Sequence, residues 1–344
     1  MSPKICILPE HRGVGGPASF RASLIAGLAD LGIENCSDPA LMGVSAVLVI
    51  GGTRRLDQLR QARQRGIRIV QRLNGINWVH RKTHTGLRHY LRAEINNWIL
   101  TTIRKNLADL IVYQSAFTED WWNEVRGQAS CPTAVIHNGV DLKTFSPSPR
   151  NPLPWDHIRV LVVEGRFGGG YEIGLENAVR FSEALREIIH KPVELVLAGD
   201  PSQGLTEKYS ALDCVTWKGI VPRPELPALY RSAHLLFSAD IKASCPNAVI
   251  EALACGLPVV GYDTGALGEL INGQGGLIVP YGVNPLELQP ALPIPLAESS
   301  SQVLENHEKF SRQARLRAET VFGLDMMIKE YLQVLLPGQG YSNN

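Results

Sequence analysis

The sequence predicts an α/β protein made of two doubly wound domains, each built on a mostly parallel sheet. Short apolar segments that suit strands alternate with helical segments along most of the 344 residues. Several strands are continuous apolar runs, as expected when helices cover both faces of a sheet. Halfway along the chain the alternation stops at residues 146–154, where four of nine positions are proline, a composition typical of an exposed interdomain linker.

The first expected domain covers residues 1–145. Its strands are expected at Lys4–Pro9, Ala46–Gly51, Ile67–Arg72, Leu110–Tyr113 and Ala134–His137. Helical patterns lie between them at Pro17–Leu31, Leu56–Arg65, Leu87–Leu107 and Phe117–Arg126.

The second expected domain covers residues 155–319. Its strands are expected at Arg159–Val163, Glu194–Ala198, Cys214–Trp217, Leu235–Ser238 and Pro258–Tyr262, and its helices at Glu176–Ile189, Glu225–Ser232 and Ala248–Cys255. A long helical region follows at about Ala297–Leu336, with a break near Gly323. Two doubly wound domains joined by a linker predict a cleft, and ligands of such sheets bind at the carboxyl ends of strands.

Composition places the chain among globular proteins, with 44% hydrophobic and 19% charged residues. The six cysteines are scattered without a CxxC spacing, and no histidine cluster completes a zinc set, so we expect reduced thiols and no metal site. Nothing resembles a signal peptide, and no apolar run is long enough to span a bilayer. We therefore expect a cytoplasmic protein.

Charge is unevenly distributed although the net charge is only +1. Residues 1–120 hold 16 Lys and Arg against 9 Asp and Glu, and the remainder is acidic. A basic first half suggests an anionic partner or an anionic membrane surface. The alternative is solvated arginine on exposed helix faces, as at Arg60, Arg63 and Arg65.

A glycine-rich loop, Gly13-Val14-Gly15-Gly16-Pro17-Ala18, follows the first strand and precedes a helix. Glycines let the backbone approach a ligand, and a helix N-terminus favours an anion such as pyrophosphate or a carboxylate. The loop also fits a loose dinucleotide fingerprint, which requires an acidic residue at the end of the second strand. The region 32–37 offers only Glu34 and no convincing strand end, and a purely structural tight turn is a third interpretation.

A lone glutamate, Glu251, lies on a helix that is otherwise apolar almost all round. Ser244 or Cys245 can cap this helix, Pro246 suits its first turn and Gly256 its end. A buried carboxylate needs a partner, and the two hydroxyls of a ribose would supply one beside a phosphate at the helix N-terminus. The alternatives are an Arg or Lys partner, or a solvent-facing side chain.

Four segments together resemble glycosyltransferase family 4, the retaining enzymes with the GT-B fold of two Rossmann-like domains facing across a cleft. They are the Gly15-Gly16 loop, the segment from Val135 through Asn138 and Gly139 to Phe145, Gly165-Arg166-Phe167, and Asn247 to Glu251 with the following Ala-Leu-Ala-Cys-Gly-Leu-Pro-Val-Val. The resemblance covers nearly the whole chain and implies that the last helix, about 320–337, packs back on the first domain.

The resemblance implies a role for each matching residue. Arg166 would contact the pyrophosphate and Glu251 the ribose hydroxyls, which makes both candidate catalytic residues. The complete set of expected donor-binding residues is Gly15, Gly16, Arg166, Gly219, Ile220, Val221, Ser244, Cys245, Pro246, Asn247 and Glu251. The loop from Lys218 to Val221 would read the base through its backbone.

Two positions depart from the family pattern. The family usually has a second glutamate eight positions before Glu251, where this chain has Ala243, and Asp240 or Ser244 is a candidate substitute. The family also has a lysine five positions after the arginine, where this chain has Tyr171. Both departures bear on donor choice and on activity.

The loop after the strand Ile67–Arg72 should face the cleft, and it carries the expected acceptor-side residues. Asn74, Trp78 and Arg81 could bind a sugar or phosphate, and His80 is a third candidate catalytic residue, with His84 and His137 as competitors. Core packing is an equal alternative for Trp78.

The resemblance implies a hexosyltransferase of polysaccharide biosynthesis that moves a sugar, with retention and without an obligatory metal or cofactor, from a UDP-, GDP- or ADP-linked sugar to a glycan or lipid-linked acceptor. The alternatives are a nucleotide-sugar epimerase or hydrolase of GT-B fold, or a binding protein without turnover. No nucleic-acid partner is expected. Peripheral contact with an anionic membrane, on its inner face, is a further expectation. Trp98, Ile95, Ile99, Leu100 and Ile103 supply an apolar stripe for it, although core packing explains such a stripe more often than lipid contact.

Overall fold

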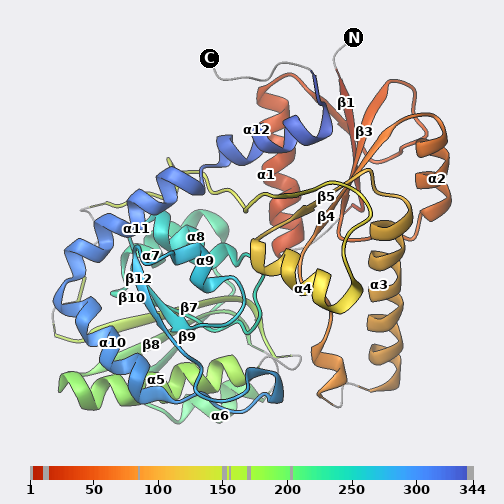
Figure 1. Cartoon of the computed structure of the whole chain (residues 1–344). Coiled ribbons are helices and arrows are strands. Elements are labelled where there is room, and N and C mark those ends of the chain that lie inside the picture. Colours follow the sequence, from red (N-terminus) through yellow and green to blue (C-terminus); the bar gives the residue numbers. More distant parts are fainter. Residues whose placement is uncertain are drawn as a thin grey trace. The chain divides into compact units, whose positions relative to one another are not determined.

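The computed structural model describes residues 3–10, 15–83, 86–148, 153–154, 156–168, 172–201 and 204–338 (Figure 1). The chain divides into two compact units. The first comprises Met1–Trp78, Gly86–Gly139 and Leu324–Asn344, and the second comprises Val79–Thr85 and Val140–Gly323. The expected first domain differs from the first unit, because residues 79–85 and 140–145 lie in the second. Residues 149–152 of the expected linker lie outside the described residues.

The first unit contains a six-stranded parallel sheet with the order β2-β1-β3-β4-β5-β6. Its strands are β1 (Lys4–Leu8), β2 (Glu34–Cys36), β3 (Val44–Ile50), β4 (Arg68–Leu73), β5 (Leu110–Tyr113) and β6 (Thr133–Val135). The register pairs Ile7 with Leu48 and Leu48 with Val70, so apolar side chains of neighbouring strands share a face. The sheet order turns back at β1, which lies between β2 and β3.

Helices cover both faces of this first sheet (Figure 1). They are α1 (Gly16–Asp30), α2 (Leu56–Gln64), α3 (Leu87–Asn106), α4 (Ala116–Arg126) and α12 (Leu324–Leu335). Alternation along β1 decides which helix each side chain meets: Ile5 and Ile7 pack with α1 and α12, while Cys6 and Leu8 pack with α2 and α3. This is why β1 reads as a continuous apolar run.

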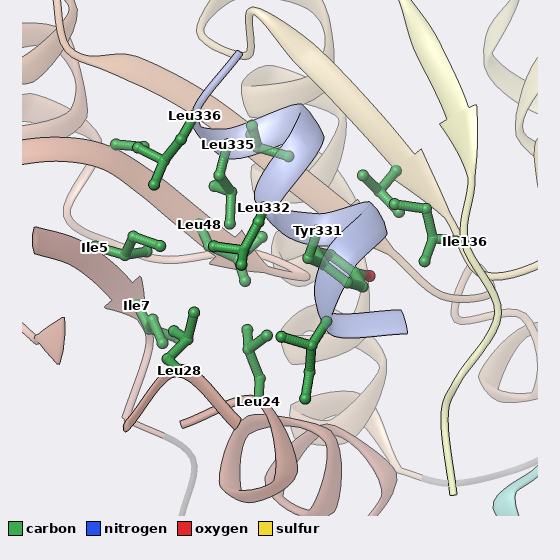
Figure 2. Close-up of a cluster of buried hydrophobic side chains, with 14 of the residues drawn as sticks. Ile5, Ile7, Leu24, Leu28, Leu48, Ile136, Tyr331, Leu332, Leu335 and Leu336 are labelled. Carbon is green, nitrogen blue, oxygen red and sulfur yellow. The ribbon is translucent and has the colours of Figure 1, made fainter. Parts of the chain in front are cut away.

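The C-terminal helix α12 is an integral part of the first unit's core. Figure 2 shows Tyr331, Leu332 and Leu335 lying among side chains of β1, β3 and α1. Each of the three is at most 1% exposed. Complete burial of a leucine contributes about 1.5–3 kcal/mol, so this helix contributes strongly to the stability of the unit.

The local sequence explains where several helices of the first unit begin and end. Gly15 is the N-cap of α1 and Pro17 lies in its first turn, as predicted. The hydroxyl of Ser115 caps α4 by accepting a hydrogen bond from the Thr118 amide, and Gly127 ends that helix with a φ of 76°.

The second unit contains another six-stranded parallel sheet, with the order β12-β11-β10-β7-β8-β9. Its strands are β7 (Ile158–Phe167), β8 (Val193–Pro201), β9 (Val215–Gly219), β10 (Leu235–Ser238), β11 (Val259–Tyr262) and β12 (Gly276–Val279). The first strand of the unit, β7, lies in the middle, with later strands added on one side and then on the other. The two parallel sheets confirm the α/β prediction.

The helices of the second unit again lie on both faces of its sheet, with α5 and α8 on opposite sides (Figure 1). They are α5 (Glu172–Ile189), α6 (Leu205–Ser210), α7 (Leu226–Arg231), α8 (Asn247–Ala254), α9 (Leu267–Ile271), α10 (Pro293–Glu305) and α11 (His307–Val321), with short 3-10 turns η1 (Val79–Arg81), η2 (Arg223–Glu225) and η3 (Pro285–Glu287). Helix α10 packs on α5, and α11 packs on α8. The expected C-terminal break near Gly323 is present, and a second break falls at Asn306.

Candidate functional site

The carboxyl edge of the second sheet, at β7 and β10, is the point where the strand order reverses. Ligands of doubly wound sheets bind in the crevice at such a point, because the connections on its two sides run to opposite faces. The last residues of β7 are Glu164, Gly165, Arg166 and Phe167, and Asp240 follows β10. The donor-binding residues that the sequence predicts in the second domain are therefore expected at this edge.

Arg166 lies at this edge and is available for an anion. Its side chain is 70% exposed, and its Nε donates to Oδ2 of Asp200 at 3.1 Å. Among the described residues its two terminal nitrogens have no hydrogen-bond partner. An exposed ion pair contributes little stability, but it fixes the direction of the guanidinium. Tyr171, Gly169 and Gly170, which follow Arg166, lie outside the described residues.

Glu164 and Asp240 form a pair of partly buried carboxyl groups at the same edge. Burial raises the pKa of Asp240 to about 7. Burial, with the neighbouring charge of Asp240, raises the pKa of Glu164 well above its usual range. Two such groups cannot both ionise cheaply, so the pair holds protons to higher pH than isolated carboxyls. Sequence reasoning missed Glu164, although a lone acid in an apolar strand is the same signal that identified Glu251.

Glu251 lies on α8 with only 4% of its surface exposed. Its Oε1 accepts from Nη1 of Arg223 at 2.9 Å, and its Oε2 accepts from the hydroxyl of Tyr230 at 3.0 Å. Burial raises the pKa of the Glu251 carboxyl, and Arg223 and Tyr230 oppose that rise. The sequence left a ribose, an Arg or a Lys open as the partner of Glu251, and the structure shows an arginine, Arg223. A bound ribose is therefore not needed to offset the burial of this carboxylate.

The start of α8 differs from the prediction. Pro246 is the N-cap and no side chain caps the helix, so the expectation that Ser244 or Cys245 caps it, with Pro246 inside the first turn, was wrong. The preceding loop is instead held by its backbone, where the Ala243 carbonyl accepts from the Ala266 amide at 2.8 Å. Asn247 is the first helical residue. The predicted end at Gly256 is confirmed, with a φ of 73°.

The predicted base-reading loop continues directly into the partner of Glu251. Strand β9 ends at Gly219, which has a φ of 65°, and Ile220 is 61% exposed. After Val221 and a proline the chain enters η2, which begins with Arg223. The structure thus brings this loop and Glu251 together through Arg223, a residue that sequence reasoning did not identify.

Gly15 and Gly16 stand at the start of α1, at the carboxyl edge of the first sheet. A Cβ added at either position would meet no atom within 4 Å, so packing does not require glycine there. Gly13 and Val14 of the same loop lie outside the described residues. Glu34, the acidic residue considered for the dinucleotide alternative, is the first residue of β2 and forms an ion pair of 2.9 Å with Lys4. The region that offered no convincing strand does form one, the edge strand β2.

The expected acceptor-side residues fall into both units. Asn74 is exposed in the first unit, and its carbonyl accepts from Nε1 of Trp122 at 2.7 Å. Trp78 packs against the hydrophobic cluster that contains Trp122. This is the core-packing alternative that the sequence offered for Trp78. His80 is 5% exposed and Arg81 is exposed, and both lie on η1 in the second unit. His84 lies outside the described residues.

A cavity of about 660 Å³ opens within the first unit at the carboxyl ends of β1, β3 and β4. Four arginines line it, and the described residues of its wall include no Asp or Glu: Pro9, Pro17, Ile50, Gly51, Gly52, Thr53, Arg54, Arg55, Arg72, Asn74, Arg92, Asn96, Ile99 and Leu100. Of these the sequence had identified only Asn74 as a site residue.

Among the described residues, no three or more His, Cys, Asp and Glu side chains are grouped so that they could hold a metal ion. None of the helices in the described part of the chain combines the length and the apolar character needed to cross a bilayer.

Comparisons with known proteins agree on one class of enzyme. Residues 160–292 match the model of the family described as glycosyl transferases group 1. Glycogen synthase of Mycobacterium tuberculosis is 28% identical over 49% of this chain and 41% of its own length. The D-inositol 3-phosphate glycosyltransferase of Rhodococcus erythropolis is 30% identical over 55% of this chain and 47% of its own. The chain thus spans less than half the length of these curated relatives.

Solved structures share the fold over nearly the whole chain. Sucrose-phosphate synthase from Thermosynechococcus elongatus matches with a TM-score of 0.75 and 19% identity over 97% of this chain and 98% of its own. WaaG, a glycosyltransferase involved in lipopolysaccharide biosynthesis, matches with a TM-score of 0.67 and 14% identity over 97% and 100%. The GT-B fold class, with two Rossmann-like domains, is confirmed. The relatives and neighbours are glycosyltransferases, and together with the matched segment they support the glycosyl transferases group 1 family for this chain.

Proposed function

We propose that the chain is a retaining glycosyltransferase that moves a sugar from a nucleotide-diphosphate sugar to a glycan or lipid-linked acceptor without an obligatory metal. One observation carries the proposal. The segment matched to the family, residues 160–292, contains all but the first two residues of the central strand β7 and the whole edge at which Arg166, the loop after β9 and the start of α8 are found.

A UDP-, GDP- or ADP-linked sugar is the proposed donor. Structures of Anabaena Alr3699/HepE were solved with UDP and with UDP-glucose, and the latter matches this chain with a TM-score of 0.62 and 17% identity. In this chain the exposed guanidinium of Arg166 would bind the diphosphate by charge-assisted hydrogen bonds. The backbone of Gly219–Val221 would contact the base, and the amides at Asn247 would lie toward the phosphates.

The proposed contact between Glu251 and the ribose requires free acceptor positions on the carboxylate. An ionised carboxylate offers about four such positions, and Arg223 and Tyr230 occupy one on each oxygen. The side chain of Arg223 is 48% exposed, so its guanidinium can move into solvent when a ligand approaches. Glu251 would then exchange a protein donor for a ribose hydroxyl, while Tyr230 keeps the carboxylate in place.

The reaction itself requires one bond to form and one to break at the anomeric carbon. The acceptor hydroxyl oxygen forms the new bond, the bond from the anomeric carbon to the diphosphate oxygen breaks, and the hydroxyl proton passes to the leaving diphosphate. Negative charge develops on that diphosphate, and a preorganised cationic donor such as Arg166 stabilises it. Glu164 and Asp240, at the same sheet edge, are candidates to fill the place left by Ala243 beside the donor sugar.

A peripheral membrane contact belongs to the same proposal, and helix α3 supplies the surface for it. Leu87, Leu91, Ile95 and Trp98 are 74%, 52%, 50% and 61% exposed and lie on one side of this helix. Ile99, Leu100 and Ile103, which the sequence grouped with them, are buried instead. An exposed apolar stripe on a helix that also carries exposed arginines fits the surface of an anionic bilayer.

The test is a two-step assay. A thermal-shift screen with UDP-, GDP-, ADP- and dTDP-sugars first identifies the donor, and we expect one of them to raise the melting temperature. Product analysis with that donor then compares reactions with and without glycan or lipid-linked acceptors. Transfer that depends on the acceptor supports the proposal. Rapid conversion of donor alone would indicate an epimerase or hydrolase, and stabilisation without any product would indicate a binding protein.

A further inference from the structure

The cavity of the first unit lies at the point where its strand order reverses. Strand β1 pairs with β2 on one side and with β3 on the other, and the cavity is lined by Pro9, just after β1, and by Thr53, just after β3. This is the position at which doubly wound sheets bind ligands, because the loops from neighbouring strands diverge there. The position of the cavity is therefore typical of a ligand-binding site and not of a packing defect.

Positive charge dominates the wall of this cavity. Arg54 and Arg55 come from the loop after β3, Arg72 from β4 and Arg92 from α3, so separate segments converge on one space. The described lining residues include no acidic side chain that would neutralise them. Arg54 and Arg92 are exposed and make no ion pair with another described residue. A pocket of this kind concentrates anions.

Arg72 is the fixed member of the group. It is 2% exposed, its Nη2 donates to Oδ1 of Asn138 at 2.7 Å, and its guanidinium lies 3.8 Å from the ring centroid of Phe20. A guanidinium held in one orientation loses little entropy when it binds an anion, and it offers the planar fork that matches phosphate oxygens. Arg55 is exposed, and its Nη1 donates to the carbonyl of Ser37 at 2.9 Å.

Two glycines bring the loop after β3 close to the helix that carries Arg92. Gly51 has a φ of 70°, a conformation that side-chain-bearing residues rarely adopt. A Cβ on Gly52 would lie 3.0 Å from Ile99 and 3.2 Å from Leu100 of α3. Glycine at these positions thus lets Thr53, Arg54 and Arg55 approach α3, which closes one side of the cavity.

We propose that this arginine-lined cavity binds a phosphate or diphosphate group of the acceptor, so that the substrate receiving the sugar is a phosphorylated one. The inference rests on the proposed function, and it adds the chemical class of the acceptor. The phosphate can belong to a soluble sugar phosphate or to a lipid-linked phosphate. The exposed stripe of α3 next to Arg92 is placed to contact the apolar chain of the lipid-linked form.

The first test measures anion binding without any turnover. Calorimetry with inorganic pyrophosphate is done on chains that all carry Arg166→Ala, so that the proposed donor-diphosphate site does not contribute to the signal. It compares this parent chain with the same chain carrying Arg54→Ala, Arg92→Ala or both, and these two side chains are exposed, so the fold should persist. Each single variant should weaken binding about tenfold, the loss of one charge-assisted hydrogen bond. Arg60→Ala is the matched control, because Arg60 is an exposed arginine of α2 that does not line the cavity. Unchanged affinity in the double variant would overturn the site.

A second measurement distinguishes the proposed acceptor site from the proposed donor site. Arg166→Ala should weaken binding of the nucleotide sugar identified by thermal shift, and it should leave pyrophosphate binding in the first unit unchanged. Arg54→Ala and Arg92→Ala should leave the nucleotide-sugar shift intact. If the first-unit variants abolish that shift, the cavity holds the donor phosphates and the acceptor assignment is wrong.

The transfer assay then tests the acceptor itself. Phosphorylated acceptors should react with a KM at least about tenfold lower than their dephosphorylated forms, and Arg92→Ala should remove that difference. Glucose 6-phosphate in solution and dihexadecyl phosphate in phosphatidylcholine vesicles, used as competitors, distinguish the two sources of phosphate. Pyrophosphate binding without transfer from any donor would contradict the proposed function while leaving the anion site, and equal KM values for both forms would contradict the phosphorylated acceptor alone.

Discussion

Arg223 and Glu251 form an ion pair of 2.9 Å between an arginine side chain that is 48% exposed and a glutamate side chain that is 5% exposed. The asymmetry decides what each side chain can do. Glu251 is held in place by the buried hydroxyl of Tyr230, while Arg223 can reach water without leaving the loop that follows β9. The pair therefore has a fixed member and a movable one, and the movable member is on the loop expected to contact the base.

Replacing Glu251 with alanine should lower the free energy of unfolding by about 1–3 kcal/mol. The Tyr230 hydroxyl would then be buried without its acceptor, which is the main cost, while Arg223 can be solvated. Urea denaturation measures the change, and Glu225→Ala, an exposed acid of η2, is the control. Unchanged stability would show that the protein contacts of Glu251 contribute nothing, and would leave ligand binding as its role.

The contact between α1 and α12 should be sensitive to a single methyl group. A Cβ on Gly27 would lie 1.9 Å from Cδ1 of Ile328, the far end of a flexible side chain. Gly27→Ala should therefore cost about 1–3 kcal/mol of stability through overpacking. Ile328→Ala in the same chain should recover part of that loss, and a double-mutant cycle by urea denaturation measures the coupling. Additive effects would contradict the contact.

Stability should depend on pH through Glu164 and Asp240. The pKa of Asp240 rises on folding from 3.8 to about 7, and that of Glu164 rises too, because burial disfavours both charges. The folded chain then binds more protons than the unfolded chain between about pH 4 and pH 7, so this contribution to stability is present at low pH and is lost as the pH rises through that window.

Asp240→Asn should reduce this pH dependence. Urea denaturation at pH 4.5 and pH 8 should show the variant gaining stability relative to the wild type at the higher pH. Asp213→Asn, at an exposed position before β9, serves as the control. A difference between wild type and Asp240→Asn that does not change with pH would contradict the raised pKa values.

Vesicle binding should depend on the exposed stripe of α3. Leu91→Ser and Trp98→Ser should weaken binding to anionic vesicles about tenfold or more, because each removes exposed apolar area that would enter the headgroup region. Co-sedimentation with phosphatidylglycerol vesicles measures the effect, with Leu316→Ser, an equally exposed leucine on α11, as the control. Equal binding by all variants would remove α3 as the membrane surface.

Much of the fold could be predicted because buried parallel strands are apolar without interruption. Strands such as β3 and β10 were located within two residues at each end. The strands that escaped prediction, β2 and β12, lie at sheet edges and have only three and four residues, and β2 is also polar and largely exposed. Two helices that were missed, α6 and α9, have six and five residues, too few to show a helical period. The break at Asn306 has no glycine or proline to mark it.

A residue of the candidate site could be predicted only where its neighbours in the sequence supply a local pattern. Arg166 follows a strand and Glu251 interrupts an apolar helix, so each has a local signal. Arg223 is 28 residues from Glu251, and no pattern in the sequence joins them. The arginines of the cavity lie on three segments of the first unit, and only the parallel sheet, which collects strand ends at one edge, brings them together.

The most direct test of the proposed activity is transfer of a radiolabelled sugar from the identified nucleotide sugar to extracted glycan or lipid-linked acceptors. We expect label in an acceptor product, with a rate about 100-fold lower for Arg166→Ala, since one preorganised donor to the leaving diphosphate is lost. Arg312→Ala, at an exposed arginine of α11, should react like the wild type. Label found only in free sugar would contradict the proposed transfer, and an unchanged rate for Arg166→Ala would contradict the role of Arg166.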